Sequence, residues 1–172
     1  MSQTSPLSPA SDRVKAGAAF VLGLAAILGA LAFQFIGGLY PCELCLTQRW
    51  PYYIGLPLLA LALIIWSKLP TPLRVGLMGV VAGLFAWGAW VGGYHAGVEW
   101  GWWPGPQSCT GVGDDAVSLD MLSDMSDVRI VPCDAIQWEM AGISLAGFNA
   151  LISAAIVVML VLAIIGQLRR KA

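Results

Sequence analysis

Four long apolar runs constrain this chain more than any other feature. They cover residues of about 16 to 36, 46 to 66, 75 to 94 and 143 to 166. A helix needs about 20 mainly apolar residues to cross the hydrocarbon core of a bilayer. The chain of 172 residues is 58% hydrophobic and only 11% charged, which excludes an ordinary soluble domain. We therefore predict an all-α membrane protein, a four-helix transmembrane bundle over residues 16–168 with no second domain.

The basic residues predict how the bundle is oriented. If four helices cross alternately, seven basic residues fall on one side: Arg13, Lys15, Lys68, Arg74, Arg169, Arg170 and Lys171. The positive-inside rule makes that side cytoplasmic. We therefore expect both termini in the cytoplasm, with tails at 1–15 and 169–172, and non-cytoplasmic loops at about 37–45 and 96–142. A cleavable signal peptide is the alternative for the first run, but that run is longer than the usual apolar region of about 7–15 residues.

Two segments carry secondary expectations. The third run contains the pairs Gly79/Gly83 and Gly88/Gly92, whose spacing favours close helix packing. In the long outer loop, apolar residues at helical spacing between 117 and 128 predict an amphipathic helix that lies on the membrane or packs against the loop. Three tryptophans at the start of this loop suit either the interfacial belt or contact with a partner or cofactor: Trp100, Trp102 and Trp103.

The predicted topology places all four cysteines on the non-cytoplasmic side. Cys42 and Cys45 follow the first span, and Cys109 and Cys133 follow the third. Disulfides form and persist outside the reducing cytoplasm. Four cysteines allow three pairings, and two cysteines three apart lie close enough to close a small disulfide.

The segment around Cys42 and Cys45 is typical of a redox centre. A helix that begins near Cys45 points its N-terminal amides at a thiol and would place Arg49 one turn later on the same face. Both the helix end and a cation favour a thiolate. A purely structural disulfide, with Arg49 as an interfacial anchor, is the alternative. A zinc site is disfavoured by the 24-residue spacing of the second pair, and a c-type haem would need histidine where Leu46 stands.

Two cysteine pairs on one side predict a relay of thiol–disulfide exchange. Cys109 and Cys133 flank an acidic loop that could carry a cysteine toward a soluble partner, and exchange proceeds through a mixed disulfide. A relay that oxidises thiols needs an electron acceptor that is not itself a thiol, and the natural acceptor at this depth is a membrane quinone. The single histidine, His95, is either a hydrogen-bonded structural residue or part of this site.

These motifs together resemble the bacterial disulfide-bond formation protein DsbB family, which are quinone-dependent thiol oxidases. The resemblance covers about residues 16–168. It rests on the segment Pro41-Cys42-Glu43-Leu44-Cys45 with Gln48-Arg49, on His95, on Cys109 and Cys133, and on the run from Cys133 through Trp138 to Ser144. Some members carry glutamate where this chain has Gln48.

The resemblance implies a reaction in the bacterial inner membrane. Cys109, paired at rest with Cys133, would be attacked by a periplasmic DsbA-like thioredoxin-fold oxidase, and Cys133 would pass the electrons to Cys42. Cys45 would donate them as a thiolate to ubiquinone or menaquinone. Arg49 would stabilise the thiolate and the quinone charge, His95 would hydrogen-bond a quinone oxygen, and Gln48 would lie at the same site. No metal and no nucleic acid are expected.

Two alternatives of other kinds stay open. A vitamin K epoxide reductase-like enzyme also couples a Cys-x-x-Cys motif to a quinone, but places that motif late in its chain. A structural membrane protein with two inert disulfides is the second alternative.

Overall fold

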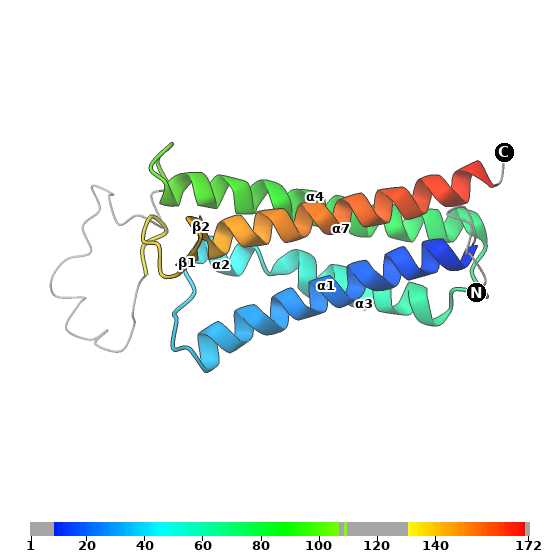
Figure 1. Cartoon of the computed structure of the whole chain (residues 1–172), viewed down its shortest axis with the longest axis horizontal. Helices are drawn as coiled ribbons and strands as arrows, with labels where there is room; N and C mark the ends of the chain where they lie inside the picture. The colour runs from blue at the N-terminus through cyan, green and yellow to red at the C-terminus, as the bar shows by residue number, and fades with distance from the viewer. Residues whose placement is uncertain (1–8, 107–108, 110–130, 171–172) are drawn as a thin grey trace, which may run out of the picture.

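Five helices and one short hairpin make up the described part of the chain (Figure 1). The computed structural model describes residues 9–106, 109 and 131–170. The helices are α1 (Pro9–Phe35), α2 (Glu43–Thr47), α3 (Trp50–Ile64), α4 (Thr71–Glu99) and α7 (Leu145–Arg169). The amphipathic helix predicted between 117 and 128 lies outside the described residues.

The four longer helices run alongside one another, and α1 begins at the end of the bundle where α7 ends (Figure 1). Three helical stretches are long and apolar enough to cross a membrane: Ser11–Phe35, Thr71–Glu99 and Leu145–Arg169. Helix α3 is shorter, with 15 residues. The expectation of a mainly helical membrane protein is confirmed at this level, whereas four spans and their orientation stay predictions.

The second apolar run does not form the single helix that we predicted from Cys45 onward. Helix α2 ends at Thr47 and α3 begins at Trp50, with Pro51 in its first turn. A proline ring clashes with the carbonyl four residues earlier in a continuous helix, which here belongs to Thr47. The break therefore falls where Pro51 requires it, and Gln48 and Arg49 lie in the turn between the two helices.

The other helices extend beyond their predicted bounds. Helix α1 begins at Pro9, so residues 9–15 are helical rather than a free tail, and Asp12 is buried. Helix α4 runs from Thr71 to Glu99, with a proline in its first turn. It therefore carries His95 one turn before its end instead of at its end.

The segment between Cys133 and the last helix contains the one departure from an all-α fold in the described residues. Strands β1 (Glu139–Met140) and β2 (Ile143–Ser144) pair antiparallel. They are joined by Ala141 and Gly142, which both have positive φ, as a tight hairpin turn requires. The last span was predicted from residue 143, but Ile143 and Ser144 form β2 and α7 begins only at Leu145.

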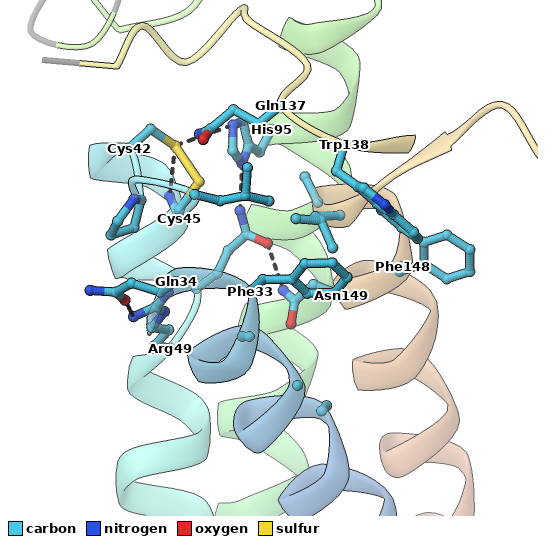
Figure 2. A pocket seen from close by; sticks show the side chains of 18 of the residues that line it. Phe33, Gln34, Cys42, Cys45, Arg49, His95, Gln137, Trp138, Phe148 and Asn149 are labelled. Atoms are coloured by element: carbon cyan, nitrogen blue, oxygen red, sulfur yellow. Dashed lines mark hydrogen bonds between the residues drawn. A yellow bond between two sulfur atoms is a disulfide. The ribbon is translucent and has the colours of Figure 1, made fainter. Parts of the chain in front are cut away.

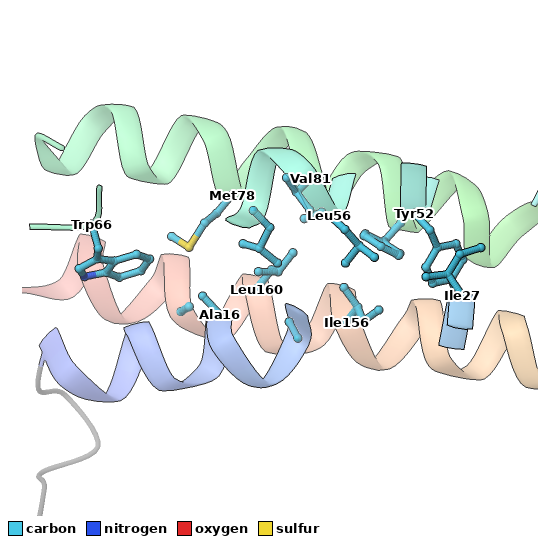
Figure 3. Packing of buried hydrophobic residues seen from close by; sticks show 14 residues of the cluster. Ala16, Ile27, Tyr52, Leu56, Trp66, Met78, Val81, Ile156 and Leu160 are labelled. Carbon is cyan, nitrogen blue, oxygen red and sulfur yellow. The ribbon is translucent and has the colours of Figure 1, made fainter. Parts of the chain in front are cut away.

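The core lies along the bundle axis and joins all four long helices (Figure 3). Ala16 of α1, Leu59 of α3, Phe85 of α4 and Ile156 of α7 are all buried within it. The second predicted glycine pair packs closely. A Cβ atom at Gly92 would lie 2.9 Å from the backbone nitrogen of Ala150 in α7, whereas one at Gly79 or Gly83 would meet nothing within 4 Å.

Candidate active site

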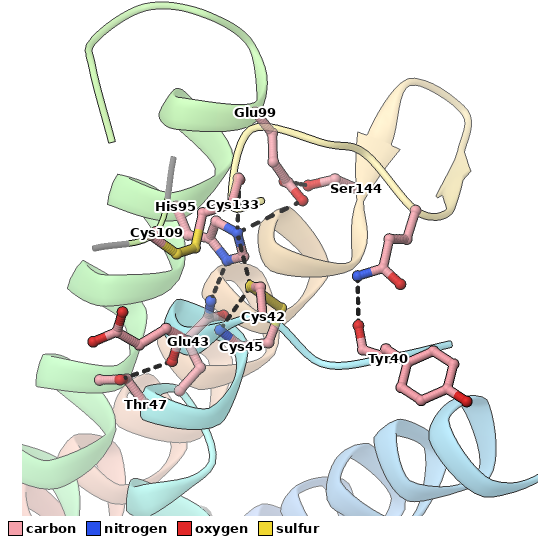
Figure 4. Close-up of a disulfide and its surroundings, with 12 residues drawn as sticks. Tyr40, Cys42, Glu43, Cys45, Thr47, His95, Glu99, Cys109, Cys133 and Ser144 are labelled. Atoms are coloured by element: carbon pink, nitrogen blue, oxygen red, sulfur yellow. Dashed lines mark hydrogen bonds and ion pairs between the residues drawn. A yellow bond between two sulfur atoms is a disulfide. The ribbon is translucent and has the colours of Figure 1, made fainter. Parts of the chain in front are cut away.

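Two disulfides pack against each other at the end of the bundle remote from the start of α1 (Figures 1 and 4). Cys42 is bonded to Cys45, with Cα atoms 5.0 Å apart, and Cys109 is bonded to Cys133, with Cα atoms 5.4 Å apart. Cys42, Cys109 and Cys133 are buried in one cluster. Residues 24 positions apart in the long loop are thereby held beside the Cys-x-x-Cys motif, as a relay between the pairs would need.

Cys42, not Cys45, receives the amide at the start of the helix. It is the N-cap residue of α2, and its Sγ accepts a hydrogen bond of 3.1 Å from the backbone nitrogen of Cys45. Helix α2 thus begins at Glu43, two residues before the Cys45 from which the sequence predicted a helix. Both Cys42 and Cys45 line the pocket described below, and Cys45 is the less buried of the two.

His95 lies between the two disulfides (Figure 4). Its Nε2 atom is 3.2 Å from the backbone carbonyl oxygen of Cys133 and 3.6 Å from the sulfur of Cys42. Its Nδ1 atom is 2.6 Å from the side-chain nitrogen of Gln48. Both ring nitrogens thus have protein partners, so a hydrogen bond from His95 to a quinone oxygen would require one of these contacts to be released.

Gln48 is itself held by polar residues from neighbouring helices. Its side-chain oxygen accepts a hydrogen bond of 2.7 Å from Asn149 Nδ2, and Asn149 Oδ1 accepts one of 2.6 Å from the Tyr52 hydroxyl. The Tyr52 oxygen lies 3.3 Å from Ser153 Oγ. A line of polar side chains therefore runs from His95 down into the bundle, through residues of α3 and α7.

A carboxylate closes the other side of the histidine. Glu99, one turn after His95 on α4, places its Oε1 atom 3.9 Å from His95 Nε2. Its second oxygen accepts a hydrogen bond from Ser144, whose own Oγ caps α7 by accepting from the backbone nitrogen of Gly147. The hairpin before α7 is thus tied to the same end of α4 as the disulfides.

The Cys42–Cys45 disulfide opens onto a pocket of about 320 Å³ between α1 and α7 (Figure 2). The wall formed by α1 is made of small and apolar side chains, and Trp138 and Phe148 lie on the opposite side. Polar residues line the pocket as well, and Gln48, Arg49 and His95 are among them. An apolar cleft with a few polar groups is the usual form of a site for a small organic molecule.

Arg49 lines this pocket together with Cys45 although the helix breaks between them. Its guanidinium donates a hydrogen bond of 2.5 Å to the side-chain oxygen of Gln34, near the end of α1. The hydrogen bond therefore ties the turn that follows α2 to the end of the first helix, and both residues line the pocket.

The ligand atoms of Cys42, Cys45 and His95 lie within 4.8 Å of one another, a grouping that can hold a metal ion. Both sulfurs are bonded to each other, however, and metal binding needs free thiolates. The absence of a metal stays a prediction.

All the residues predicted to belong to the redox site lie at this end of the bundle: Cys42, Cys45, Gln48, Arg49, His95, Cys109 and Cys133. Sequence reasoning missed Gln34, Tyr52, Glu99 and Asn149. The signal for Asn149 was present, because an amide in an otherwise apolar span needs a polar partner in the protein. Nothing in the sequence indicated which partner that was.

The comparison with known protein families agrees with this arrangement. The family described as "Disulfide bond formation protein DsbB" matches residues 12–163 of the chain. No curated protein and no solved structure matches the chain.

Proposed function

Because the chain belongs to the DsbB family of membrane thiol oxidoreductases that form disulfide bonds, we propose that it reoxidises a periplasmic DsbA-like thiol oxidase and delivers the electrons to a membrane quinone. Each turnover converts one partner dithiol to a disulfide and moves two electrons and two protons to the quinone, yielding the quinol. The protein lies in the inner membrane, with four spans and with both cysteine pairs on the periplasmic side.

One observation carries the proposal. The Cys42–Cys45 disulfide has the second disulfide on one side and the apolar pocket on the other. An inert structural disulfide needs neither neighbour. A disulfide that takes electrons from one thiol pair and gives them to a hydrophobic acceptor needs both.

The proposed order of exchange is the one that the family resemblance implies. Cys109 and Cys133 belong to the long loop, and the partner dithiol attacks there, with Cys109 as the sulfur that forms the mixed disulfide. The released Cys133 thiolate then attacks Cys42, in the same buried cluster. The Cys42–Cys45 bond breaks, and the thiolate of Cys45 is left on the pocket side.

The pocket suits a quinone ring. Small residues of α1, including Ala26, Gly29 and Ala30, leave room for a flat ring opposite Phe148. A Cβ atom at Gly29 would meet nothing within 4 Å, so the space there is open. A bound quinone supplies the two-electron acceptor. Arg49 stabilises negative charge at the disulfide end of the pocket, because a guanidinium favours both a thiolate and a reduced oxygen beside it.

The test is a reconstitution with purified components. The protein in detergent is mixed with a reduced DsbA-like protein and with ubiquinone or menaquinone analogues, and the loss of quinone absorbance is followed. We expect quinone reduction in step with oxidation of the partner. Cys45→Ser should abolish quinone reduction while the Cys109–Cys133 disulfide is still reduced by the partner.

Partner oxidation that continues without consumption of either quinone would exclude the quinone as acceptor. Disulfides that the reduced partner leaves intact would instead favour the alternative of a structural membrane protein.

A further inference from the structure

The hydrogen bonds around His95 allow only one assignment of donors and acceptors. The backbone carbonyl of Cys133 can only accept, so the His95 Nε2 atom that contacts it at 3.2 Å must carry a proton. In a neutral imidazole, Nδ1 is then an acceptor, and the Gln48 amide at 2.6 Å donates to it.

The remaining groups continue the same direction. With its NH₂ group turned to His95, Gln48 presents its oxygen to the Asn149 amide at 2.7 Å. Asn149 then presents its own oxygen to the Tyr52 hydroxyl at 2.6 Å, which donates. With the direction set by the Cys133 carbonyl, this orientation of the two amides satisfies every contact in the Tyr52–Asn149–Gln48 chain, and the Tyr52 oxygen can still accept from Ser153 Oγ at 3.3 Å.

That tautomer determines what faces the disulfides. With a proton on Nε2, the ring donates to the carbonyl of Cys133 and presents the same N–H toward the Cys42 sulfur at 3.6 Å. With the proton on Nδ1, an unprotonated Nε2 would face the carbonyl oxygen, and lone pair would meet lone pair. The contact that holds the Cys133 backbone beside Cys42 would be lost.

We propose that Tyr52, Asn149 and Gln48 are positioning residues that fix His95 in its Nε2–H tautomer, and that this ring holds Cys133 beside Cys42 for exchange between the two cysteine pairs. The consequence for turnover rests on the function proposed above. The tautomer and the contact between the pairs do not, because they involve neither partner nor quinone.

Nitrogen NMR can read this tautomer directly, because His95 is the only histidine of the chain. Protein labelled with ¹⁵N-histidine should give a protonated signal for Nε2 and an unprotonated signal for Nδ1. A protonated Nδ1, or an equal mixture of the two tautomers, in the unmodified protein would overturn the proposal without any mutation.

Tyr52→Phe tests the far end of the chain while keeping the ring that packs edge-on against Phe85. Without the hydroxyl, the Asn149 oxygen loses its donor, and the two amides can turn over. We expect the signals to move toward the Nδ1–H tautomer. Tyr94→Phe is the matched control, because it removes a hydroxyl from the residue next to His95 that bonds only the Pro104 carbonyl among the contacts described. It should leave the tautomer unchanged.

A second measurement follows contact between the two cysteine pairs. In a Cys45→Ser, Cys109→Ser background, only Cys42 and Cys133 can form a disulfide, and its rate of formation with a limiting chemical oxidant is read by gel mobility. Tyr52→Phe should slow it about fivefold, the factor that corresponds to one neutral hydrogen bond of about 1 kcal/mol. Tyr94→Phe should not.

A tautomer that shifts without slower pairing, or slower pairing without a tautomer shift, would each overturn the proposed link. If the tautomer and the pairing rate change as expected but the protein does not reduce quinone, the result would count against the proposed function alone.

Discussion

Among the described residues that line the pocket, Arg49 is the one lysine or arginine, and Gln34 holds it. It lies in the turn before α3 and lines the same pocket as the Cys42–Cys45 disulfide. A planar head with several donors can bond an amide oxygen and a second acceptor together, whereas an ammonium is a point charge. The side chain is therefore suited to two tasks, bonding Gln34 of α1 and stabilising charge inside the pocket.

Replacing Arg49 should weaken use of the quinone. We expect Arg49→Ala to lower kcat/KM for the quinone about 10- to 100-fold, the range for loss of a charged hydrogen bond worth about 1.5–3 kcal/mol. Arg49→Lys should lose less, and both should raise the quinone KM. Steady-state quinone reduction at varied quinone measures this. Arg13→Ala is the control, because Arg13 contacts the Leu63 carbonyl near the other end of α3. An unchanged rate and KM in Arg49→Ala would mean that Arg49 is only an interfacial anchor.

Two glycines of α1 test where the quinone lies. A Cβ atom at Gly29 or at Gly17 would meet nothing within 4 Å, but only Gly29 lines the pocket. Gly29→Leu should raise the quinone KM about tenfold, which corresponds to about 1.4 kcal/mol of lost binding. Gly17→Leu should leave it unchanged. Equal effects of the two variants would place the quinone elsewhere.

The residues with distinctive chemistry were predictable at this scale, and those with ordinary chemistry were not. A Cys-x-x-Cys motif followed by Arg49 is compatible with few functions. The role of Tyr52 and Asn149 depends on their contact with each other. They are 97 positions apart in the sequence and meet only because α3 packs on α7. Hydropathy predicts that both helices cross the membrane but says nothing about which faces meet.

At the scale of elements, composition predicted the apolar helices, and local backbone chemistry decided their ends. The run of about 46 to 66 is apolar from Trp50 onward, and the polar residues Thr47, Gln48 and Arg49 at its start did not by themselves predict a break. Pro51 supplied the reason, and the turn it enforces gives Gln48 and Arg49 separate directions. The hairpin of β1 and β2 escaped prediction because two-residue strands carry too short a pattern to read.

The contact between α4 and α7 should be sensitive to one methyl group. Gly92→Ala would place a Cβ atom 2.9 Å from the Ala150 backbone nitrogen, which cannot rotate away. We expect it to lower the free energy of unfolding by about 1–3 kcal/mol. Gly83→Ala, on the same helix with nothing within 4 Å, should be neutral or stabilising by up to about 1 kcal/mol. Unfolding in mixed detergent with increasing denaturing detergent compares the two. Equal stability would mean that the helices can separate at little cost.

The whole molecule has two ends of different character. At one end the two disulfides and His95 are buried together. At the other, Asp12 is buried against α7 and forms an ion pair with Arg170, which ties the first helix to the last. The basic residues near this second end are those whose distribution predicts a cytoplasmic side.

Cysteine labelling tests that orientation. The four native cysteines are paired in the structure, so an added thiol can be labelled selectively without reductant. A cysteine replacing Thr71, at the start of α4, should be protected from an impermeant maleimide in intact cells and react after lysis. A cysteine replacing the exposed Trp102 should react in intact cells. Labelling of the first in intact cells would overturn the predicted orientation.

The shortness of α3 has a consequence for the surrounding lipid. Its 15 residues at about 1.5 Å each cover about 22 Å, less than the roughly 30 Å of an average hydrocarbon layer. If α3 crosses the membrane as predicted, the bilayer must thin beside it to avoid hydrophobic mismatch. Acyl chain length would then act on this enzyme as a physical variable. Shorter lipid chains would match α3 without deformation, and longer ones would strain the turn that carries Arg49.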